Sequence, residues 1–412
     1  MDYFEYRDGE LWAEAIRVSD LVEQYGTPLY VYSAKTLRRH YHAFDTALGD
    51  LDHLTCFSVK ANSNVNLLRL LGGLGAGVDI VSGGELHRAL AAGIDPCKIV
   101  FSGVGKQEHE IREALNADIL MFNVESAQEL KHIGRIAAEM NRPARISMRI
   151  NPDVDPKTHP YISTGLKKNK FGLDMLEATG AYLLAKETPY VEPVGLDCHI
   201  GSQLTQIGPF VEALKKLLAF ADRLQSSGVE IRYLDLGGGL GITYNEESPP
   251  LPAELGQAIA DTIAGRTLTV ILEPGRAIAG NAGILATRVL YTKKTSAKHF
   301  VIVDAAMNDL VRPSLYGAYH RIGEVTPKAR EKIVVDVVGP ICESSDFLAQ
   351  DRQLPTMEPG EYLAVFSAGA YGFTMSSQYN SRPRAAEVIV DGDRASIARR
   401  RETYADLIAL EI

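Results

Sequence analysis

Lys60 is the first side chain whose place in the sequence points to chemistry. The stretch FSVKAN (57–62) runs an apolar, strand-like segment straight into this amine, and lysine is rarely buried without a partner or a task. Three later apolar runs end in comparable groups: the imidazole of His199, the glycine triplet 237–239 and the carboxylate of Glu273. Each has a simpler explanation when taken alone: a solvated lysine, a structural histidine or a tight turn. The question is whether the fold brings them together.

The segments that must position these groups alternate between strand and helix. From about residue 54, apolar runs typical of buried strands are separated by amphipathic stretches such as ESAQELKHIGRIAAEM (125–140). This alternation indicates parallel strands with crossover helices, and eight such units close into a (β/α)8 TIM-like barrel. The alternative is an open doubly wound sheet, but that fold usually carries a GxGxxG turn, a spacing absent from this sequence. The predicted strands are 54–59, 77–82, 98–103, 118–124, 145–150, 194–200, 232–237 and 268–273.

In such barrels the active site lies at the carboxyl ends of the strands. Lys60, His199, the triplet 237–239 and Glu273 all stand at those ends, and Asp79 lies on the second strand. The loops after strands seven and eight commonly hold a phosphate through exposed backbone N–H groups. A lysine, a phosphate cradle and a carboxylate together predict pyridoxal phosphate (PLP), with the amine forming a Schiff base. Glu273 would keep the ring nitrogen protonated, and His199 would lie flat against the ring.

The rest of the chain predicts a second domain made of strands. After residue 280 the helical period fades, and strand-like runs such as 283–291 and 332–339 are separated by turn residues. The run TPLYVYS (27–33) is also strand-like. We therefore expect a PLP-binding barrel at 34–278 and a β-sandwich or β-barrel-like domain at 279–412 that also takes in residues 1–33.

Composition limits the classes of partner. The net charge of −9 argues against a nucleic-acid or anionic-membrane partner. The four cysteines are far apart without a CxxC spacing, which favours a reduced compartment. The N-terminus lacks the apolar core of a signal peptide, and no run of about 18 apolar residues exists. We expect a cytoplasmic protein without a metal site.

Longer motifs carry a resemblance to a known family. VKAN (59–62), SGGEL (82–86), HIGSQ (199–203), LDLGGGLG (234–241) and EPGR (273–276) resemble the fold-type III PLP-dependent decarboxylases. Three downstream motifs narrow the resemblance to the diaminopimelate decarboxylase family: MNDLVRPSLYGAYH (307–320), GPICESSDFLA (339–349) and GAYGFTMSSQYNSRPR (369–384). The resemblance covers nearly the whole chain.

This resemblance implies roles for particular residues. Lys60 would carry the cofactor, His199 would stack on its ring, and Cys342 would return a proton after CO2 leaves. The implied cofactor-binding residues are Lys60, Asp79, His199, Ser202, Gly238, Gly239, Glu273, Gly275, Arg276 and Tyr371. The implied substrate-binding residues are Arg276, Arg312, Tyr316, Glu343 and Tyr371.

The implied reaction is the decarboxylation of meso-2,6-diaminopimelate to L-lysine and CO2, the last step of lysine biosynthesis. Decarboxylases of ornithine, arginine or carboxynorspermidine share the fold and remain alternatives, as do, more distantly, a racemase-like enzyme and a non-catalytic PLP-binding protein. In relatives the CES segment (342–344) enters the partner's active site, so the resemblance implies a homodimer with Cys342 and Glu343 supplied in trans. The polar segment 151–172 follows strand five and is interpreted as a mobile lid, with a plain surface excursion as the alternative.

Overall fold

The computed structural model describes residues 2–155 and 170–412, and its internal contacts divide the chain into two compact units. The barrel unit comprises His40–Ile242 and Ser248–Ala277. The β unit comprises Met1–Arg39, Thr243–Glu247 and Ile278–Ile412. Most of the predicted lid, residues 156–169, lies outside the described residues.

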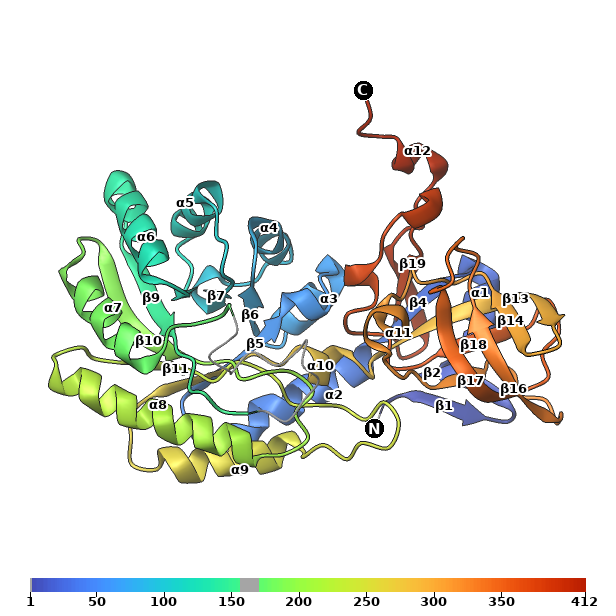
Figure 1. The fold of residues 1–412 in the computed structure, drawn as a ribbon, viewed down its shortest axis with the longest axis horizontal. Coiled ribbons are helices and arrows are strands. Elements are labelled where there is room, and N and C mark those ends of the chain that lie inside the picture. Colours follow the sequence, from blue (N-terminus) through green and yellow to red (C-terminus); the bar gives the residue numbers. More distant parts are fainter. Residues whose placement is uncertain (1, 156–169) are drawn as a thin grey trace. The chain divides into compact units, whose positions relative to one another are not determined.

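Eight parallel strands of the barrel unit close into a ring, which confirms the predicted (β/α)8 barrel (Figure 1). Neighbours in sequence are neighbours in space, and β12 pairs in parallel with β5 to complete the circle. Each predicted strand overlaps one strand of the ring. The strands are β5 (His53–Ser58), β6 (Gly77–Ile80), β7 (Ile99–Phe101), β8 (Met121–Val124), β9 (Ala144–Arg149), β10 (Val191–Asp197), β11 (Tyr233–Asp235) and β12 (Thr269–Leu272).

Helices follow the strands and bury one apolar face each. Side-chain caps mark where several begin: Ser82 accepts a hydrogen bond from the Glu85 N–H, Ser126 from the Glu129 N–H, and Asp174 from two N–H groups. The helices of this region are α2 (Ala34–Asp45), α3 (Val65–Gly72), α4 (Gly83–Ala91), α5 (Glu108–Ala117), α6 (Ala127–Met140), α7 (Met175–Glu187), α8 (Gly208–Ser226), α9 (Pro252–Ile263) and α10 (Arg276–Ala279). These elements hold the strand ends at one rim.

The barrel interior combines an apolar layer with a polar one. Cys56, Val100, Val194 and Ile271 belong to a buried hydrophobic cluster. Toward the carboxyl ends of the strands, the Asn123 amide donates to Asp235 at 3.1 Å. These two residues lie on β8 and β11, which are three strands apart in the ring, so this hydrogen bond crosses the interior. Buried polar groups need hydrogen-bond partners, and such groups are often found at functional sites. The polar layer at the carboxyl ends of the strands is therefore a candidate functional site.

The β unit is built around a sheet of nine strands and a small sheet of three. β4 pairs antiparallel with β13 and parallel with β19, so the N-terminal strand joins the C-terminal domain as predicted. The nine strands are β4 (Leu29–Ser33), β13 (Gly283–Lys294), β14 (His299–Val303), β15 (Ile322–Glu324), β16 (Lys332–Val338), β17 (Phe347–Pro355), β18 (Tyr362–Val365), β19 (Ala386–Asp391) and β20 (Arg394–Arg399). The small sheet contains β1 (Phe4–Arg7), β2 (Glu10–Ala13) and β3 (Ile16–Arg17). Two short helices, α11 (Arg312–Tyr316) and α12 (Tyr404–Leu407), complete the unit.

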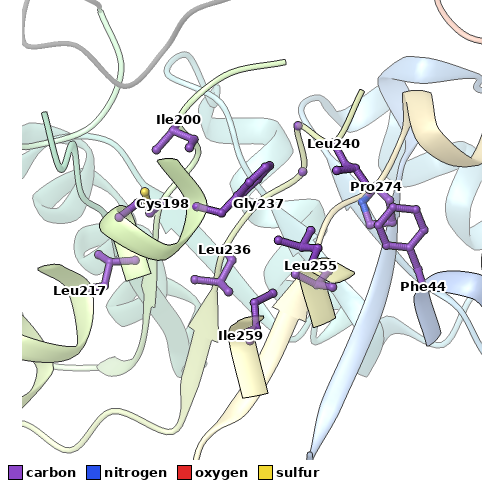
Figure 2. Close-up of a pocket in the computed structure, with 15 residues that line it drawn as sticks. Phe44, Cys198, Ile200, Leu217, Leu236, Gly237, Leu240, Leu255, Ile259 and Pro274 are labelled. Carbon is purple, nitrogen blue, oxygen red and sulfur yellow. The ribbon is translucent and has the colours of Figure 1, made fainter. Parts of the chain in front are cut away.

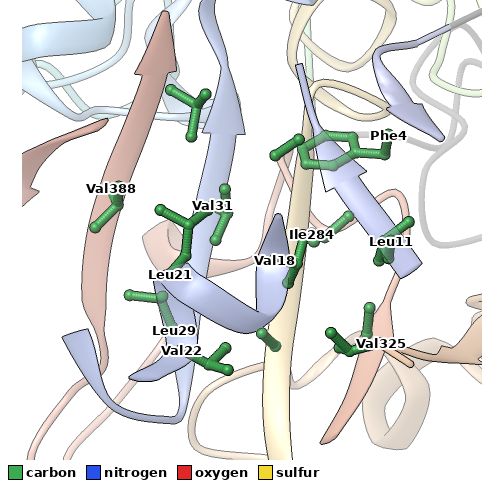
Figure 3. Packing of buried hydrophobic residues seen from close by; sticks show 14 of the residues in the cluster. Phe4, Leu11, Val18, Leu21, Val22, Leu29, Val31, Ile284, Val325 and Val388 are labelled. Carbon is green, nitrogen blue, oxygen red and sulfur yellow. The ribbon is translucent and has the colours of Figure 1, made fainter. Parts of the chain in front are cut away.

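The core of the β unit lies under helix α1 (Val18–Tyr25). Its buried residues Val18 and Leu21 pack with Val31 of β4, Ile284 of β13 and Val388 of β19 (Figure 3). Burying one such side chain stabilises a fold by about 1.5–3 kcal/mol. The N-terminal segment is therefore an integral part of this unit.

Candidate active site

Lys60 stands at the rim of the barrel above a buried carboxylate. β5 ends at Ser58, and a single 3-10 turn (Val59–Ala61) carries the lysine. Its Nζ donates to Asp79 Oδ2 at 2.5 Å, and Ser58 Oγ donates to the same oxygen at 2.6 Å. Asp79 is fully buried, whereas 39% of the Lys60 side chain is exposed. The amine is therefore anchored on Asp79, while part of the lysine side chain stays exposed.

His199 is held as a neutral imidazole. Burial lowers its pKa well below the usual value, and the positive charges of Arg149 and Lys60 lower it further. The Gly238 N–H donates to its Nδ1 at 3.2 Å, which assigns the remaining ring proton to Nε2. A neutral ring of fixed tautomer can pack flat against another ring without bringing a charge into the site.

Glu273 follows β12 and is buried in a cluster of acids. Burial raises its pKa well above the usual value, and the negative charges of Asp235, Asp79 and Asp197 raise it further, against the opposing effect of Lys60. Its Oε1 is buried and makes no hydrogen bond to any described residue. Such an oxygen is costly unless a donor reaches it, and the protonated nitrogen of a cofactor ring would be that donor.

The cluster around Glu273 contains residues that the sequence did not single out. Asp235 accepts hydrogen bonds from the Gly237 N–H at 2.9 Å and from Asn123, and burial raises its pKa to about 6. Arg149, at the end of β9, forms a buried ion pair with Glu125 at 2.8 Å. Asp235 lies inside the quoted LDLGGGLG motif, and Arg149 ends a predicted strand. Both could have been found by reading every polar residue at a strand end.

The glycine triplet forms a close-packed turn beside these groups. A Cβ on Gly238 would lie 2.2 Å from the Glu273 carbonyl oxygen, and one on Gly239 would lie 2.4 Å from that of Gly201. Gly239 also has a φ of +118°, which side chains disfavour. Arg276 Nη2 donates to Ser202 Oγ at 3.1 Å, joining the loops after β10 and β12. Gly275 packs against Ser58 and Ala61, next to Lys60.

An apolar cavity lies beneath the glycine turn (Figure 2). Leu236 and Gly237 line it with Leu255 and Ile259 of α9 and Leu217 of α8. Its volume of about 20 Å³ is close to that of one water-sized sphere, so it cannot hold a cofactor. The turn thus has a packed apolar side and a side that faces the polar rim.

The remaining predicted residues lie in the β unit and form two groups. Arg312 begins α11 and is buried; its Nη1 donates to Tyr244 Oη at 2.9 Å and to His320 Nε2 at 3.1 Å. His320 is fixed because its Nδ1 donates to the Phe366 carbonyl oxygen at 2.9 Å. Tyr316 ends the same helix, and Tyr244 and His320 are further residues that sequence reasoning missed. His320 closes the quoted RPSLYGAYH stretch, which was the available signal.

Cys342 and Glu343 form the second group and are both exposed in the single chain. The Cys342 N–H donates to Asn380 Oδ1 at 2.9 Å, and Tyr379 Oη donates to Glu343 Oε2 at 2.7 Å. Hydrogen bonds from Ser345 and Tyr379 lower the pKa of Glu343, which keeps it ionised. Tyr371, in the adjacent predicted motif, has a φ of +55°, which is rare for a bulky residue and typical of constrained functional positions.

The two units therefore carry different parts of the predicted site. The barrel rim gathers Lys60, Asp79, His199, Ser202, Gly238, Gly239, Glu273, Gly275 and Arg276. The β unit holds Arg312, Tyr316, Cys342, Glu343 and Tyr371. Among the described residues, no helix is long and apolar enough to span a bilayer.

The barrel rim fits pyridoxal phosphate on three structural grounds. The Lys60 amine is hydrogen-bonded to Asp79, and the His199 imidazole is neutral. A buried carboxyl oxygen of Glu273 accepts no hydrogen bond from the described residues. The tight glycine turn adds a backbone surface without side chains. Together with the barrel, these features define a PLP-dependent enzyme of the barrel class, and residues 34–280 match the family model for the pyridoxal-binding domain of pyridoxal-dependent decarboxylases.

Relatives extend this likeness over the whole chain. Diaminopimelate decarboxylases of Vibrio cholerae and Pseudomonas aeruginosa are each 55% identical to it, over 100% of this chain and 99% of theirs. A crystal structure of the Helicobacter pylori diaminopimelate decarboxylase complexed with L-lysine superposes with a TM-score of 0.93 at 47% identity, covering 96% of this chain and 99% of that one. The chain belongs to the diaminopimelate decarboxylase family. The resemblance, the fold and the cofactor expected from the sequence are thereby confirmed.

Proposed function

We propose that the chain uses pyridoxal phosphate to decarboxylate meso-2,6-diaminopimelate to L-lysine and CO2, the last step of lysine biosynthesis. The observation that carries this proposal is the 55% identity to diaminopimelate decarboxylases over the full length. The H. pylori relative was crystallised with L-lysine, the product expected here.

Within this proposal the barrel rim holds the cofactor. When bound, pyridoxal phosphate supplies an electron sink for the negative charge left by departing CO2. Lys60 carries the cofactor and Asp79 orients the amine; His199 packs its neutral ring against the cofactor ring. Glu273 shares the proton at the ring nitrogen, a role that its raised pKa and its buried oxygen support. The remaining cofactor-binding residues, assigned to the phosphate and its surroundings, are Ser202, Gly238, Gly239, Gly275, Arg276 and Tyr371.

The substrate has an amino-acid group at each end, so the distal end needs recognition of its own. Arg276 and Arg312 are proposed to bind the distal carboxylate with Tyr316 and Tyr371, because the guanidinium fork matches a carboxylate. Glu343 is proposed to bind the distal ammonium, and its lowered pKa supports an ionised partner. A site built for these charges discriminates against substrates that lack them.

Cys342 is proposed to donate the proton that replaces CO2 on the substrate α-carbon. Its exposure in the single chain, together with that of Glu343, supports delivery to a second subunit rather than burial in a core. We therefore propose a homodimer in which these two residues complete the partner's active site in trans. A monomer would then lack its acid.

Two further assignments belong to the same proposal. The domains are a PLP-binding barrel at 34–278 and a β domain at 1–33 plus 279–412, which the family match at 34–280 and the two compact units support. The location is the cytoplasm, which four cysteines without disulfides support.

The test is CO2 release by PLP-reconstituted protein, with product identification. We expect equimolar CO2 and L-lysine from meso-diaminopimelate, and Lys60→Ala is the inactive control. Ornithine, arginine and carboxynorspermidine are assayed in parallel. Preference for any of these three over meso-diaminopimelate would replace the proposal by the corresponding alternative.

A further inference from the structure

Tyr379 and Asn380 contact the 342–343 segment at two successive residues. The Asn380 side chain accepts the Cys342 N–H at 2.9 Å, and the Tyr379 hydroxyl donates to Glu343 Oε2 at 2.7 Å. Two adjacent residues thus hold two other adjacent residues, 36 and 38 positions away in sequence. We refer to Tyr379 and Asn380 as the clamp.

Residues on both sides of the clamp are hydrogen-bonded to other segments of the β unit. On one side, the Ser377 N–H donates to the Asn308 carbonyl oxygen at 2.9 Å. On the other, Arg382 Nη2 donates to the Asp304 carbonyl oxygen at 2.9 Å. Asn380 has a φ of +54°, a left-handed conformation that asparagine tolerates better than most residues. The Tyr379 hydroxyl is therefore presented at a defined position.

The segment that the clamp holds is itself folded. Asp346 is buried and accepts hydrogen bonds from the Ile341 N–H at 2.7 Å and from the Met307 N–H at 2.8 Å. Ser345 Oγ donates to Glu343 Oε1, which is the carboxylate oxygen that does not accept the hydrogen bond from Tyr379. Each oxygen of Glu343 thus accepts one hydroxyl hydrogen bond, which fixes the plane of the carboxylate.

We infer that Tyr379 is a positioning residue that determines specificity by holding the Glu343 carboxylate in the orientation in which it binds the substrate's distal ammonium. This inference rests on the proposed function, because Glu343 receives that partner there. A carboxylate that binds an ammonium directionally gains from a fixed plane, since no rotational freedom is then lost on binding. The clamp would thus favour substrates with an amino group at the distal end.

Tyr379→Phe tests the inference because it removes one hydroxyl from a partly exposed ring and leaves the fold intact. L-Lysine and 6-aminohexanoate serve as competitive inhibitors, since they differ only in the amino group that Glu343 would bind. We expect the inhibition constant of L-lysine and the KM for meso-diaminopimelate to rise about tenfold, the size expected for a hydrogen bond to an ionised group. The inhibition constant of 6-aminohexanoate and kcat should stay unchanged.

Two comparisons make the result decisive. Tyr291→Phe, at an exposed tyrosine of β13, should change none of these constants. In a Glu343→Gln background, Tyr379→Phe should add little, because both changes remove the same interaction. If Tyr379→Phe keeps wild-type constants while Glu343→Gln binds L-lysine and meso-diaminopimelate more weakly, the inference is wrong and the proposed function stands. Absence of CO2 release by the wild-type protein would instead overturn the proposed function.

Discussion

Gly238→Ala is the most informative single change at the barrel rim. A Cβ at this position would lie 2.2 Å from the Glu273 carbonyl oxygen, whereas real Cβ atoms essentially never approach closer than 3.0 Å. The turn or the Glu273 backbone must therefore move by about 0.8 Å. Both groups are assigned to the cofactor, so the substitution displaces the turn, the acid or both.

A displacement of this size has a calculable effect. Losing one hydrogen bond to a charged group such as the cofactor phosphate costs about 1.5–3 kcal/mol, which corresponds to about 10- to 150-fold in affinity. We expect the dissociation constant of pyridoxal phosphate to rise by that factor. Cofactor-free protein is titrated with pyridoxal phosphate, and the visible absorbance of the bound cofactor is followed at equilibrium.

Gly180→Ala is the matched control. Gly180 lies in α7, where an added Cβ meets no atom within 4 Å, so cofactor affinity should be unchanged. Stability should rise by about 0.5–1 kcal/mol, because alanine favours the helix. A folded Gly238→Ala protein with wild-type affinity would refute the reasoning that the 237–239 turn shapes the cofactor site.

Three other changes test separate parts of the account. Cys342→Ala should lower turnover at least about 100-fold without weakening cofactor binding, as CO2 release and the visible spectrum will show; unchanged turnover removes this thiol from the mechanism. The pKa of Asp235 is about 6 in the folded protein and near 4 in the unfolded chain. Its protonation therefore contributes to stability below about pH 4, and this contribution is lost as the pH rises to about 6. Urea unfolding of the cofactor-free protein between about pH 4 and pH 6 should show a loss of up to about 3 kcal/mol in the free energy of unfolding. If that free energy depends on pH in the same way in Asp235→Asn, the assignment is contradicted. The Lys106 side chain is fully buried against Glu129 at 2.7 Å, so Lys106→Met should lower the free energy of unfolding by about 3–5 kcal/mol, whereas Arg17→Met at an exposed pair should leave it nearly unchanged.

The barrel could be predicted because burial leaves a local signature. Its strands are buried on both faces, and several read as continuous apolar runs, as at Ile99–Phe101, which forms β7 and lies inside the predicted strand 98–103. The start of β10 was placed three residues late, at Val194, since Glu192 and Pro193 interrupt the apolar run although they pair with β9. Local pattern therefore locates elements better than it locates their ends.

The β unit was predicted less completely for the same reason. β17 and β20 were missed because many of their side chains are exposed and polar, so no apolar run marks them. The strands β1–β3 have only two to four residues each. Their existence depends on pairing with each other and on packing under α1, which local sequence does not encode.

The residues of the site, too, could be predicted only in part from the sequence. Lys60, His199 and Glu273 could be found because each ends an apolar run. Asn123 and Asp235 could not be paired from sequence, since 112 positions separate them and the hydrogen bond exists only once the ring closes. Tyr379 escaped notice for the same reason, because its contact with Glu343 depends on the tertiary fold.

The attachment site of the cofactor tests the central claim most directly. The PLP-loaded protein is reduced with borohydride, digested, and its peptides are weighed by mass spectrometry. Because Lys60 is the rim amine proposed to carry the cofactor, we expect the reduced pyridoxyl mass on the peptide containing Lys60 and its loss in Lys60→Ala. The same mass found instead on Lys106, or on another lysine, would contradict the account.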